Sequence, residues 1–392
     1  MPHESMSFDH LSAAAAKRHE QNGWPGSRDE AWRFTNLNAI KALSLTPAKR
    51  LDSHALSEDK NLIHFINGVA QNTDNISING VRIAPLNADS ELTTALADAV
   101  PHPHSVADFA LAHAHDGMAM TVSGQVDTPL VFRFAYEGDG ISSHPVVVVD
   151  IKPGSSVTIL EEHLGSGAGL SAPLMLYRLG EGAHLHHARR LVEDESRYHL
   201  GLNLVQLNAK ACYHGDMVMS GGAISRSETQ VRISAPDAEA YLNAVYLGRH
   251  DQMRDVTSRI DHDAPDGQSF QRIHGILDDR AKAVFQGKVK VARYAQKTDG
   301  NQMSRTLILS RQAEANTKPE LEIYADDVTC SHGATIGEID ADQLFYLKSR
   351  GISDEDARQL LIEAFLVDVI DELGDPQRDW LMAAIQSWIK VR

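Results

Sequence analysis

The spacing of apolar residues divides the chain into three regions. Residues 7–56 are polar and rich in helix formers such as Ser12–Arg18, with a break at Trp24-Pro25-Gly26. From about residue 61 to 335, short alternating or β-branched runs recur, and helical periodicity is nearly absent. Helical spacing returns towards the C-terminus. We therefore expect an N-terminal helical domain (1–60), a β-rich core (61–338) and a C-terminal helical domain (339–392).

The middle region predicts a mainly β fold. Its candidate strands are not joined by Asn-Gly or Asp-Gly hairpin turns, and polar or glycine corners separate them. Among a sandwich, a barrel and a solenoid, this pattern favours a β-solenoid, although no strict sequence repeat marks its turns. The candidate strands are Leu62–Ile66, Ile76–Ile83, Pro129–Phe134, Val146–Ile151, Val157–Leu160, Leu202–Leu207, Thr229–Ile233, Ala283–Phe285, Val289–Ala292, Arg305–Leu309 and Leu321–Tyr324.

Three helices are predicted near the C-terminus. The first is Asp340–Ser349, the second is capped by Ser353 with acidic residues in its first turn, and the third has Pro376 at its start. The third helix contains Trp380 and Trp388. These tryptophans either pack onto the β-rich core or form a partner-binding face.

Composition excludes several classes of function. The net charge of −16 argues against nonspecific binding to nucleic acid or anionic lipid. No run of 18 apolar residues predicts a membrane span, and residues 1–20 lack the features of a secretory signal. Two cysteines are too few for a disulfide framework. We therefore expect a cytoplasmic protein.

The most informative candidate site is Cys330-Ser331-His332. On a strand, residues 330 and 332 project from the same face. A thiolate and an imidazole are ligands that suit iron or zinc, but two ligands do not complete a closed site. Two interpretations stay open: a core thiol beside a hydrogen-bonded histidine, or half of a metal or cluster site that another chain completes.

Other histidines and motifs are weaker candidates. His184 and His186 have the same spacing and are similar to strand-borne histidines of cupin metal sites, but Arg189 and Arg190 follow them. We favour a solvated strand face there and keep a metal-binding β-protein as an alternative. Surface positions are expected for His102, His104, His113 and His115. The sequence contains no G-x-S-x-G, H-E-x-x-H or phosphate-loop motif, so we expect no enzymatic activity.

Several ordered segments resemble the core of the SufB/SufD family of iron–sulfur cluster assembly proteins. They are Gly275–Ala281, Phe285–Lys288, Ala295–Asp299, Thr317–Ile323, Asp326–Thr335 and Leu344–Ile352. The N-terminal segment around Trp24-Pro25 and Trp32 is similar to the helical region of the SufD type. Gly333 follows His332, where SufB chains usually have glutamate, which also favours the SufD type.

The resemblance implies a right-handed parallel β-helix core flanked by N- and C-terminal α-helical regions. It implies pairing with SufB through the β-helix, and a non-catalytic scaffold role with SufC, an ABC-type ATPase, docked on the C-terminal helices. His332 and Cys330 become one side of an interface where a transient Fe–S cluster forms with SufB, while the isolated chain holds no stable cofactor and can form a homodimer. The alternative is a purely structural spacer for SufC. The expected docking residues are Leu344, Phe345, Tyr346, Ile352, Leu361 and Phe365.

Overall fold

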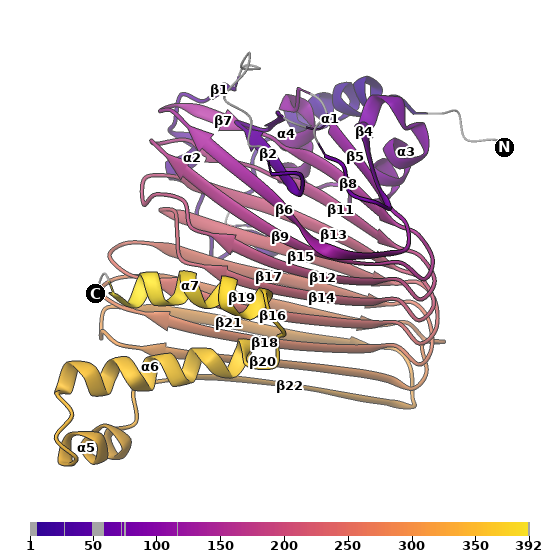
Figure 1. Ribbon diagram of the computed structural model, residues 1–392. Coiled ribbons are helices and arrows are strands. Elements are labelled where there is room, and N and C mark those ends of the chain that lie inside the picture. Colours follow the sequence, from indigo (N-terminus) through magenta and orange to yellow (C-terminus); the bar gives the residue numbers. More distant parts are fainter. Residues whose placement is uncertain are drawn as a thin grey trace.

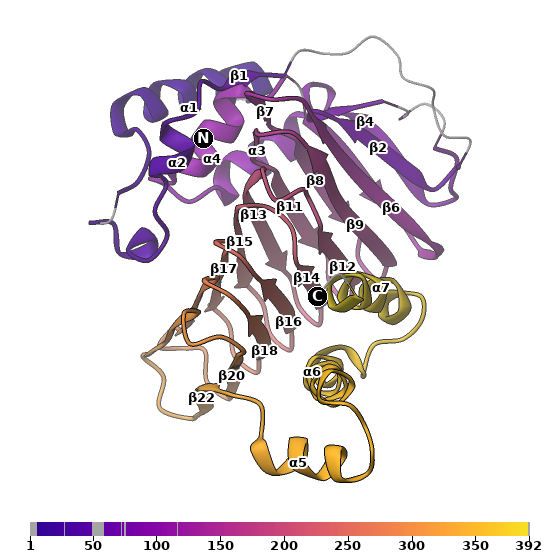
Figure 2. The ribbon, with the colours of Figure 1, turned by 90° about the vertical axis from the view of Figure 1, so that its left-hand side faces the viewer.

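The computed structural model describes residues 6–26, 28–48, 59–71, 73, 76–115 and 117–390. The chain winds through two sheets that face each other, and helices lie at one end and along one side of the stack (Figure 1; Figure 2). The first sheet contains β1 (Thr46–Pro47), β4 (Val81–Pro85), β5 (Gly117–Val122), β7 (Ile141–Ser143), β8 (Val146–Ile151), β10 (Leu170–Ser171), β11 (Leu174–Leu179), β13 (Tyr198–Leu207), β15 (Ile224–Ile233), β17 (Met253–His262), β19 (Lys282–Val291) and β21 (Glu314–Ile323). The second contains β2 (Leu62–Ile66), β3 (Val69–Ala70), β6 (Gln125–Glu137), β9 (Ser156–Ser166), β12 (His184–Leu191), β14 (Cys212–Met219), β16 (Glu239–Gly248), β18 (Gln268–Leu277), β20 (Thr298–Ile308) and β22 (Val328–Gly337).

The strands form a parallel solenoid. From β11 to β22, consecutive strands alternate between the two sheets, and each strand pairs in parallel with the next strand of its own sheet. Residues paired across neighbouring turns, such as Ile224 with Met253 and Met253 with Lys282, are 29 apart in the chain. Among the described strands, only β2–β3 and β4–β5 are antiparallel. The predicted mainly β, parallel β-helix fold is confirmed.

Columns of aligned apolar side chains fill the interior. In the first sheet, one residue from each successive turn lies in register with the next and together they form such a column. Its side chains from Val149 to Val289 are all buried. β-Branched residues suit such stacking because their side chains pack well on a pleated surface. Each buried side chain stabilises the fold by roughly 1.5–3 kcal/mol. The column is Val149, Tyr177, Val205, Val231, Ile260, Val289 and Leu321.

The corners of the solenoid also repeat. Lys210, Asp237, Asp266 and Lys297 precede successive strands of the second sheet, and all four have positive φ, between 57° and 60°. Asp tolerates this left-handed conformation better than most residues other than glycine. The corners at 235–237 and 264–266 share the sequence Ala-Pro-Asp. The structural period is therefore present in the sequence, at the corners rather than in the strands.

The N-terminal helices cover the outer face of the first sheet. They are α1 (Phe8–Asn22), α2 (Asn38–Lys41), α3 (Ser90–Ala99) and α4 (Ser105–His113), with short 3₁₀ turns η1 (Glu30–Trp32) and η3 (Leu86–Ala88). Their buried residues pack against β8, β11 and β13. The expectation that 61–335 lacks helices is wrong at α3 and α4, because both are too short to show clear periodicity. The predicted domain boundary near 57–60 adjoins residues 49–58, which lie outside the described residues.

The C-terminal helices α5 (Ala341–Ser349), α6 (Asp354–Ile370) and α7 (Gln377–Lys390) follow the prediction closely. Asp340 and Ser353 cap α5 and α6 through hydrogen bonds to backbone N–H groups. α6 contacts β16 and β18, and α7 contacts β12 and β14. Trp388 is buried, and Trp380 lies 4.1 Å from the Arg190 guanidinium, so both tryptophans pack on the β-core. None of the described helices combines the length and apolarity needed to cross a bilayer.

Candidate functional site

The candidate site lies at the open end of the solenoid. β21 and β22 are the last strands of their sheets, and among the described strands each has one hydrogen-bonded neighbour, β19 and β20 respectively (Figure 1). Their outer edges therefore present unpaired backbone N–H and C=O groups, which can pair with another strand. We call the surface formed by β21 and β22 the open end.

Cys330 lies on β22 and faces the interior of the solenoid. It pairs in register with Gly300 of β20 and packs against the apolar core. A Cβ atom at position 300 would lie 3.3 Å from the Cys330 Sγ, so glycine at that position leaves room for the sulfur. The thiol is partly buried rather than fully enclosed. It is thus held in place by the strand above and open on the side where the stack ends.

His332 occupies the next inward position of the same strand. It pairs in register with Gln302, which is buried one turn above it. Ser331, which lies between Cys330 and His332 in the sequence, donates a hydrogen bond from its hydroxyl to Asn301 Oδ1 at 2.5 Å. His332 is exposed because no further turn covers it among the described residues. The structure therefore places Cys330 and His332 on one face of the last strand.

The environment of Cys330 favours the protonated thiol. Burial raises its pKa, Asp299 raises it further, and a backbone hydrogen bond with Gly300 opposes this shift. A thiolate at this position needs a cation or a positive partner surface beside it. The isolated open end is therefore a weak ligand for a metal.

Sequence reasoning missed Gln302, which supports the strand above His332. Its amide Nε2 donates to the Glu320 carbonyl at 3.1 Å and so joins β20 to β21. Its Oε1 is buried without a hydrogen-bond partner. A polar residue inside a strand gives no sequence signal of this role, because only the register shows what lies beside it.

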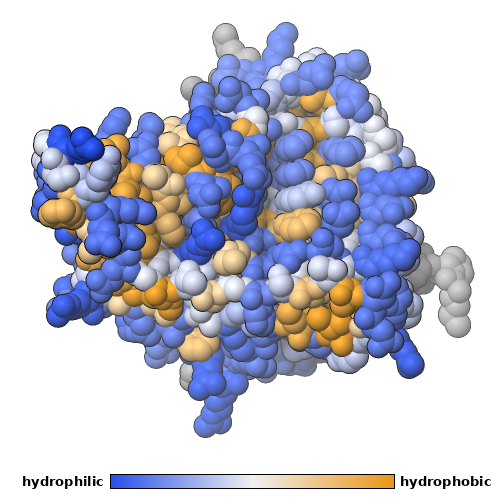
Figure 3. Space-filling view, turned by 90° about the horizontal axis from the view of Figure 1, so that it is seen from below, coloured by the Kyte–Doolittle hydropathy of each residue, from blue (hydrophilic) through white to orange (hydrophobic). Residues whose placement is uncertain are grey.

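Apolar side chains surround the open end. Ile323 and Ile336, at the ends of β21 and β22, are 38% and 47% exposed, and Tyr324 follows Ile323. Figure 3 views this end of the molecule and shows apolar patches separated by polar residues. Exposed apolar groups beside unpaired strand edges are typical of a surface that binds another chain.

The expected docking residues of the C-terminal helices differ in exposure. Phe345 and Tyr346 on α5 are 73% and 56% exposed, and α5 has no buried residue. Leu344, Ile352 and Leu361 are half-buried. Phe365 of α6 stacks on the His274 ring, with 4.5 Å between the ring centroids. α5 is therefore the more exposed surface, while Phe365 also holds α6 against the core.

The strand histidines His184 and His186 are exposed on the outer face of β12. The His186 ring stacks on His214 of the next turn, at 4.8 Å between centroids, and burial lowers the pKa of His186. Stacked rings present their faces to each other, which is a poor arrangement for binding one ion. The stack continues through Tyr241 and Phe270.

Two of the histidines expected at the surface are partly buried. His104 lies at the start of α4, and its Nε2 is 3.3 Å from Glu228 Oε1. His113 Nδ1 donates a hydrogen bond to the Phe109 carbonyl, and its ring lies between those of Phe109 and His144. The surface prediction is wrong for these two, because α4 packs against the first sheet, whereas His102 and His115 are exposed. Cys212 is buried and forms no disulfide bond.

Comparison with known proteins gives matches over most of the chain. A family model described as "SUF system FeS cluster assembly, SufBD core domain" matches residues 134–365, from β6 into α6. The iron–sulfur cluster assembly protein SufD of Escherichia coli is 28% identical over 370 residues, which are 91% of this chain and 86% of that protein. A SufBD family protein of Synechocystis is 30% identical over 386 residues, 89% of this chain and 84% of its own length. Protein ABCI7, chloroplastic, of Arabidopsis thaliana is 29% identical over 405 residues, an alignment that covers 96% of this chain and 85% of that protein.

Proposed function

Because the chain belongs to the SufBD family of the SUF system for FeS cluster assembly, we propose that it is a SufD-type subunit of an iron–sulfur cluster assembly scaffold. The matches extend over most of the chain and of its relatives, including a protein named SufD. In this proposal the chain is a non-catalytic cytoplasmic subunit, and ATP hydrolysis belongs to SufC.

The observation that supports this role most directly is the open end with Cys330 and His332. One strand supplies two soft or borderline ligands, whereas an Fe–S cluster is held by about four. A second solenoid docked edge to edge on β21 and β22 could supply the others. We propose that SufB is this second chain and brings the residues that carry sulfur.

The cluster is cargo in this mechanism, and the chain's own residues position it. His332 binds iron through the lone pair of its neutral imidazole, and Cys330 binds after losing its proton. The raised pKa of Cys330 means that this proton leaves only when iron or the partner stabilises the thiolate. Acid should therefore weaken assembly.

SufC is proposed to dock on the C-terminal helices. The exposed aromatic rings of Phe345 and Tyr346 suit a partner-binding surface, because aromatic residues often supply much of the binding energy of an interface. ATP-driven dimerisation of SufC would then pull on α5 and α6 and open the interface with SufB.

Co-purification tests the proposed assembly. A tagged form of this chain, expressed with untagged SufB and SufC from the same organism, should retain both partners through size exclusion. The proposal is wrong if the chain emerges alone while SufB and SufC remain soluble and folded.

Two other functions make different predictions. A purely structural spacer for SufC predicts that His332→Ala and Cys330→Ala both leave cluster yield unchanged. A strand-histidine metal protein predicts metal in the chain purified alone and its loss on His186→Ala. The ring stacking of His186 on His214 favours the scaffold over this second alternative.

A further inference from the structure

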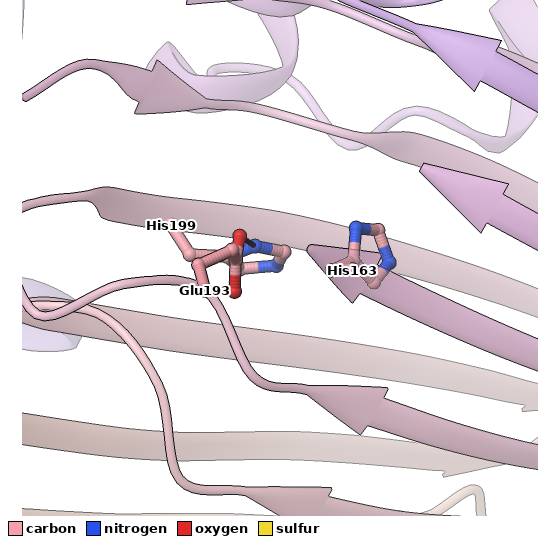
Figure 4. A group of neighbouring side chains, drawn as sticks. All are labelled: His163, Glu193 and His199. Carbon is pink, nitrogen blue, oxygen red and sulfur yellow. Dashed lines mark hydrogen bonds and ion pairs between the residues drawn. The ribbon is translucent and has the colours of Figure 1, made fainter. Parts of the chain in front are cut away.

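A second group of ligand-type side chains lies inside the solenoid, far from exposed positions. His163 is on β9 of the second sheet, Glu193 is in the connection after β12, and His199 is on β13 of the first sheet. All three are 2% exposed or less. One ligand atom from each lies within 4.8 Å of the others, and among the described residues this is the one such group. Figure 4 shows the His163 ring beside the Glu193–His199 pair.

Glu193 is incompletely satisfied in this position. Its Oε1 accepts a hydrogen bond from His199 Nδ1 at 2.7 Å, but its Oε2 is buried without any partner. A buried polar atom without a partner destabilises the fold, and a buried carboxylate oxygen does so more than a neutral group. The free oxygen therefore indicates a position for a cation or a water molecule.

His163 is oriented as metal-binding histidines usually are. Its Nε2 lies 2.7 Å from Glu161 Oε1, and the other Glu161 oxygen is held by His187 at 2.9 Å and Tyr177 at 3.0 Å. A carboxylate that accepts one ring N–H fixes the tautomer and leaves the lone pair on the other nitrogen. In His163 that other nitrogen is Nδ1, which accepts a hydrogen bond from the Tyr136 hydroxyl at 2.8 Å, and a bound ion would replace this bond.

The neighbouring cation, the guanidinium of Arg197, does not pair with the free oxygen of Glu193. Arg197 is buried beside Glu193, but its Nη1 donates to the carbonyl groups of Ser166 and Gly167 at 3.2 and 3.3 Å. Its Nε and Nη2 have no hydrogen-bond partner, so the guanidinium does not satisfy the free Glu193 oxygen. A Cβ at Gly165 would lie 2.5 Å from the Arg197 Cδ, so glycine there is required for this arrangement.

We propose that His163, Glu193 and His199 bind one divalent transition-metal ion inside the solenoid. Two imidazoles and one carboxylate are a ligand set that suits zinc and its neighbours in the first transition row, with a remaining position for water. The ion would join the two sheets at one corner of the stack. This site is separate from the open end and does not depend on the proposed scaffold role.

Because the group is enclosed, the ion should enter as the chain folds. The full chain is therefore expressed in medium supplemented with Zn²⁺ or Co²⁺, purified with a chelator wash, and analysed for metal content. We expect one ion per chain, and a Co²⁺ absorption spectrum typical of tetrahedral rather than octahedral coordination. Glu193→Gln and His199→Gln should lower the retained metal about tenfold or more.

His262→Gln is the matched control, because His262 is a buried histidine that bonds to Ser269 outside this group. This variant should retain the metal. Wild-type chain without stoichiometric metal would overturn the proposal and leave a water molecule between Glu193 and Arg197 as the occupant. Metal retention unchanged by Glu193→Gln would also overturn it. The wild-type measurement decides the question even if a variant fails to fold.

Discussion

Arg226 joins the N-terminal segment to the first sheet. Its buried guanidinium donates to Asp255 at 2.6 Å, to Glu228 at 2.9 Å and to the Ala31 carbonyl at 3.0 Å, and it lies 4.0 Å from the Trp32 ring centre. Burial alone would raise the pKa of Glu228, but His104 and Arg226 outweigh burial and lower it well below its usual range. This network therefore depends on every member being present.

We predict that Arg226→Ala lowers the free energy of unfolding by about 3–5 kcal/mol, because it removes the guanidinium that pairs with two buried carboxylates. The matched control is Arg232→Ala, in the same strand as Arg226, which removes an exposed ion pair with Asp263 and should cost no more than about 1 kcal/mol. Urea unfolding of the three proteins measures both values. Equal effects would contradict the role of the buried network.

The buried histidine His262 predicts a loss of stability in acid. Burial lowers its pKa to about 4, and nearby Asp263 opposes this only in part. The unfolded chain binds the proton at its ordinary pKa of about 6.5, so stability falls as the pH drops from about 6.5 to 4, by on the order of 3 kcal/mol. Urea unfolding at pH 7 and pH 5 should show a smaller pH dependence in His262→Gln. An unchanged dependence would contradict this account.

At the scale of single residues, only some of the candidate ligand side chains could be identified from the sequence. Cys330 and His332 were recognisable because their residue types and i, i+2 spacing are local features. His163, Glu193 and His199 were not, because they come together only when β9 and β13 take their places in opposite sheets. Glu228 and His104 are likewise partners across 124 residues. Side chains that meet across turns of a solenoid carry no local signal.

At the level of the elements, some strands were recognised, mostly as runs shorter than the strands themselves, while others such as β16, β17 and β18 were not predicted. Thr229–Ile233 is the end of the ten-residue strand β15, whose earlier residues include buried Arg226 and Glu228. These polar residues lie on the outer face of the sheet, buried beneath the N-terminal segment, where they interrupt the apolar run and hide the strand. The Ala-Pro-Asp corners at 235–237 and 264–266 were the missed signal of the repeat. The C-terminal helices were predicted well because caps such as Ser353 are local.

Because the aromatic side chains of α5 are exposed, we predict that a substitution there weakens SufC binding without lowering the stability of the fold. Phe345→Ala should weaken SufC binding about tenfold or more and leave the melting temperature unchanged, because the ring is exposed. Leu360→Ala, which removes an exposed apolar group from α6, is the comparison variant. Calorimetric titration with SufC and thermal unfolding measure the two effects. Unchanged affinity in Phe345→Ala would remove α5 from the docking surface.

As a whole, the molecule is asymmetric along the solenoid axis. At its first end the chain turns back in the antiparallel strands β3 and β4, whereas the last turn ends in β21 and β22 with unpaired edges. The interior column that is fully buried through Val289 ends at Leu321, which is only half-buried. The parallel β-helix was implied by the family resemblance rather than by composition, because net charge and chain length restrict the fold only loosely.

This asymmetry predicts that pairing occurs at the open end. The double variant Ile323→Lys and Ile336→Lys should abolish both heterodimers with SufB and any homodimer, because charges on edge strands oppose pairing. Its free energy of unfolding should stay within about 0.5 kcal/mol of wild type. Phe34→Lys, at an exposed aromatic residue of the N-terminal segment, is the control. Light scattering after size exclusion gives the mass, and a dimer that persists in the double variant would place the interface elsewhere.

The central claim is that the last strand supplies half of a cluster site. Its most direct test is cluster yield on the purified complex of this chain with SufB and SufC, measured by iron and sulfide content and by visible absorption. We predict that His332→Ala reduces the yield at least about tenfold, while the same complex still forms and SufC still hydrolyses ATP. An intact complex with unchanged cluster yield would contradict the claim.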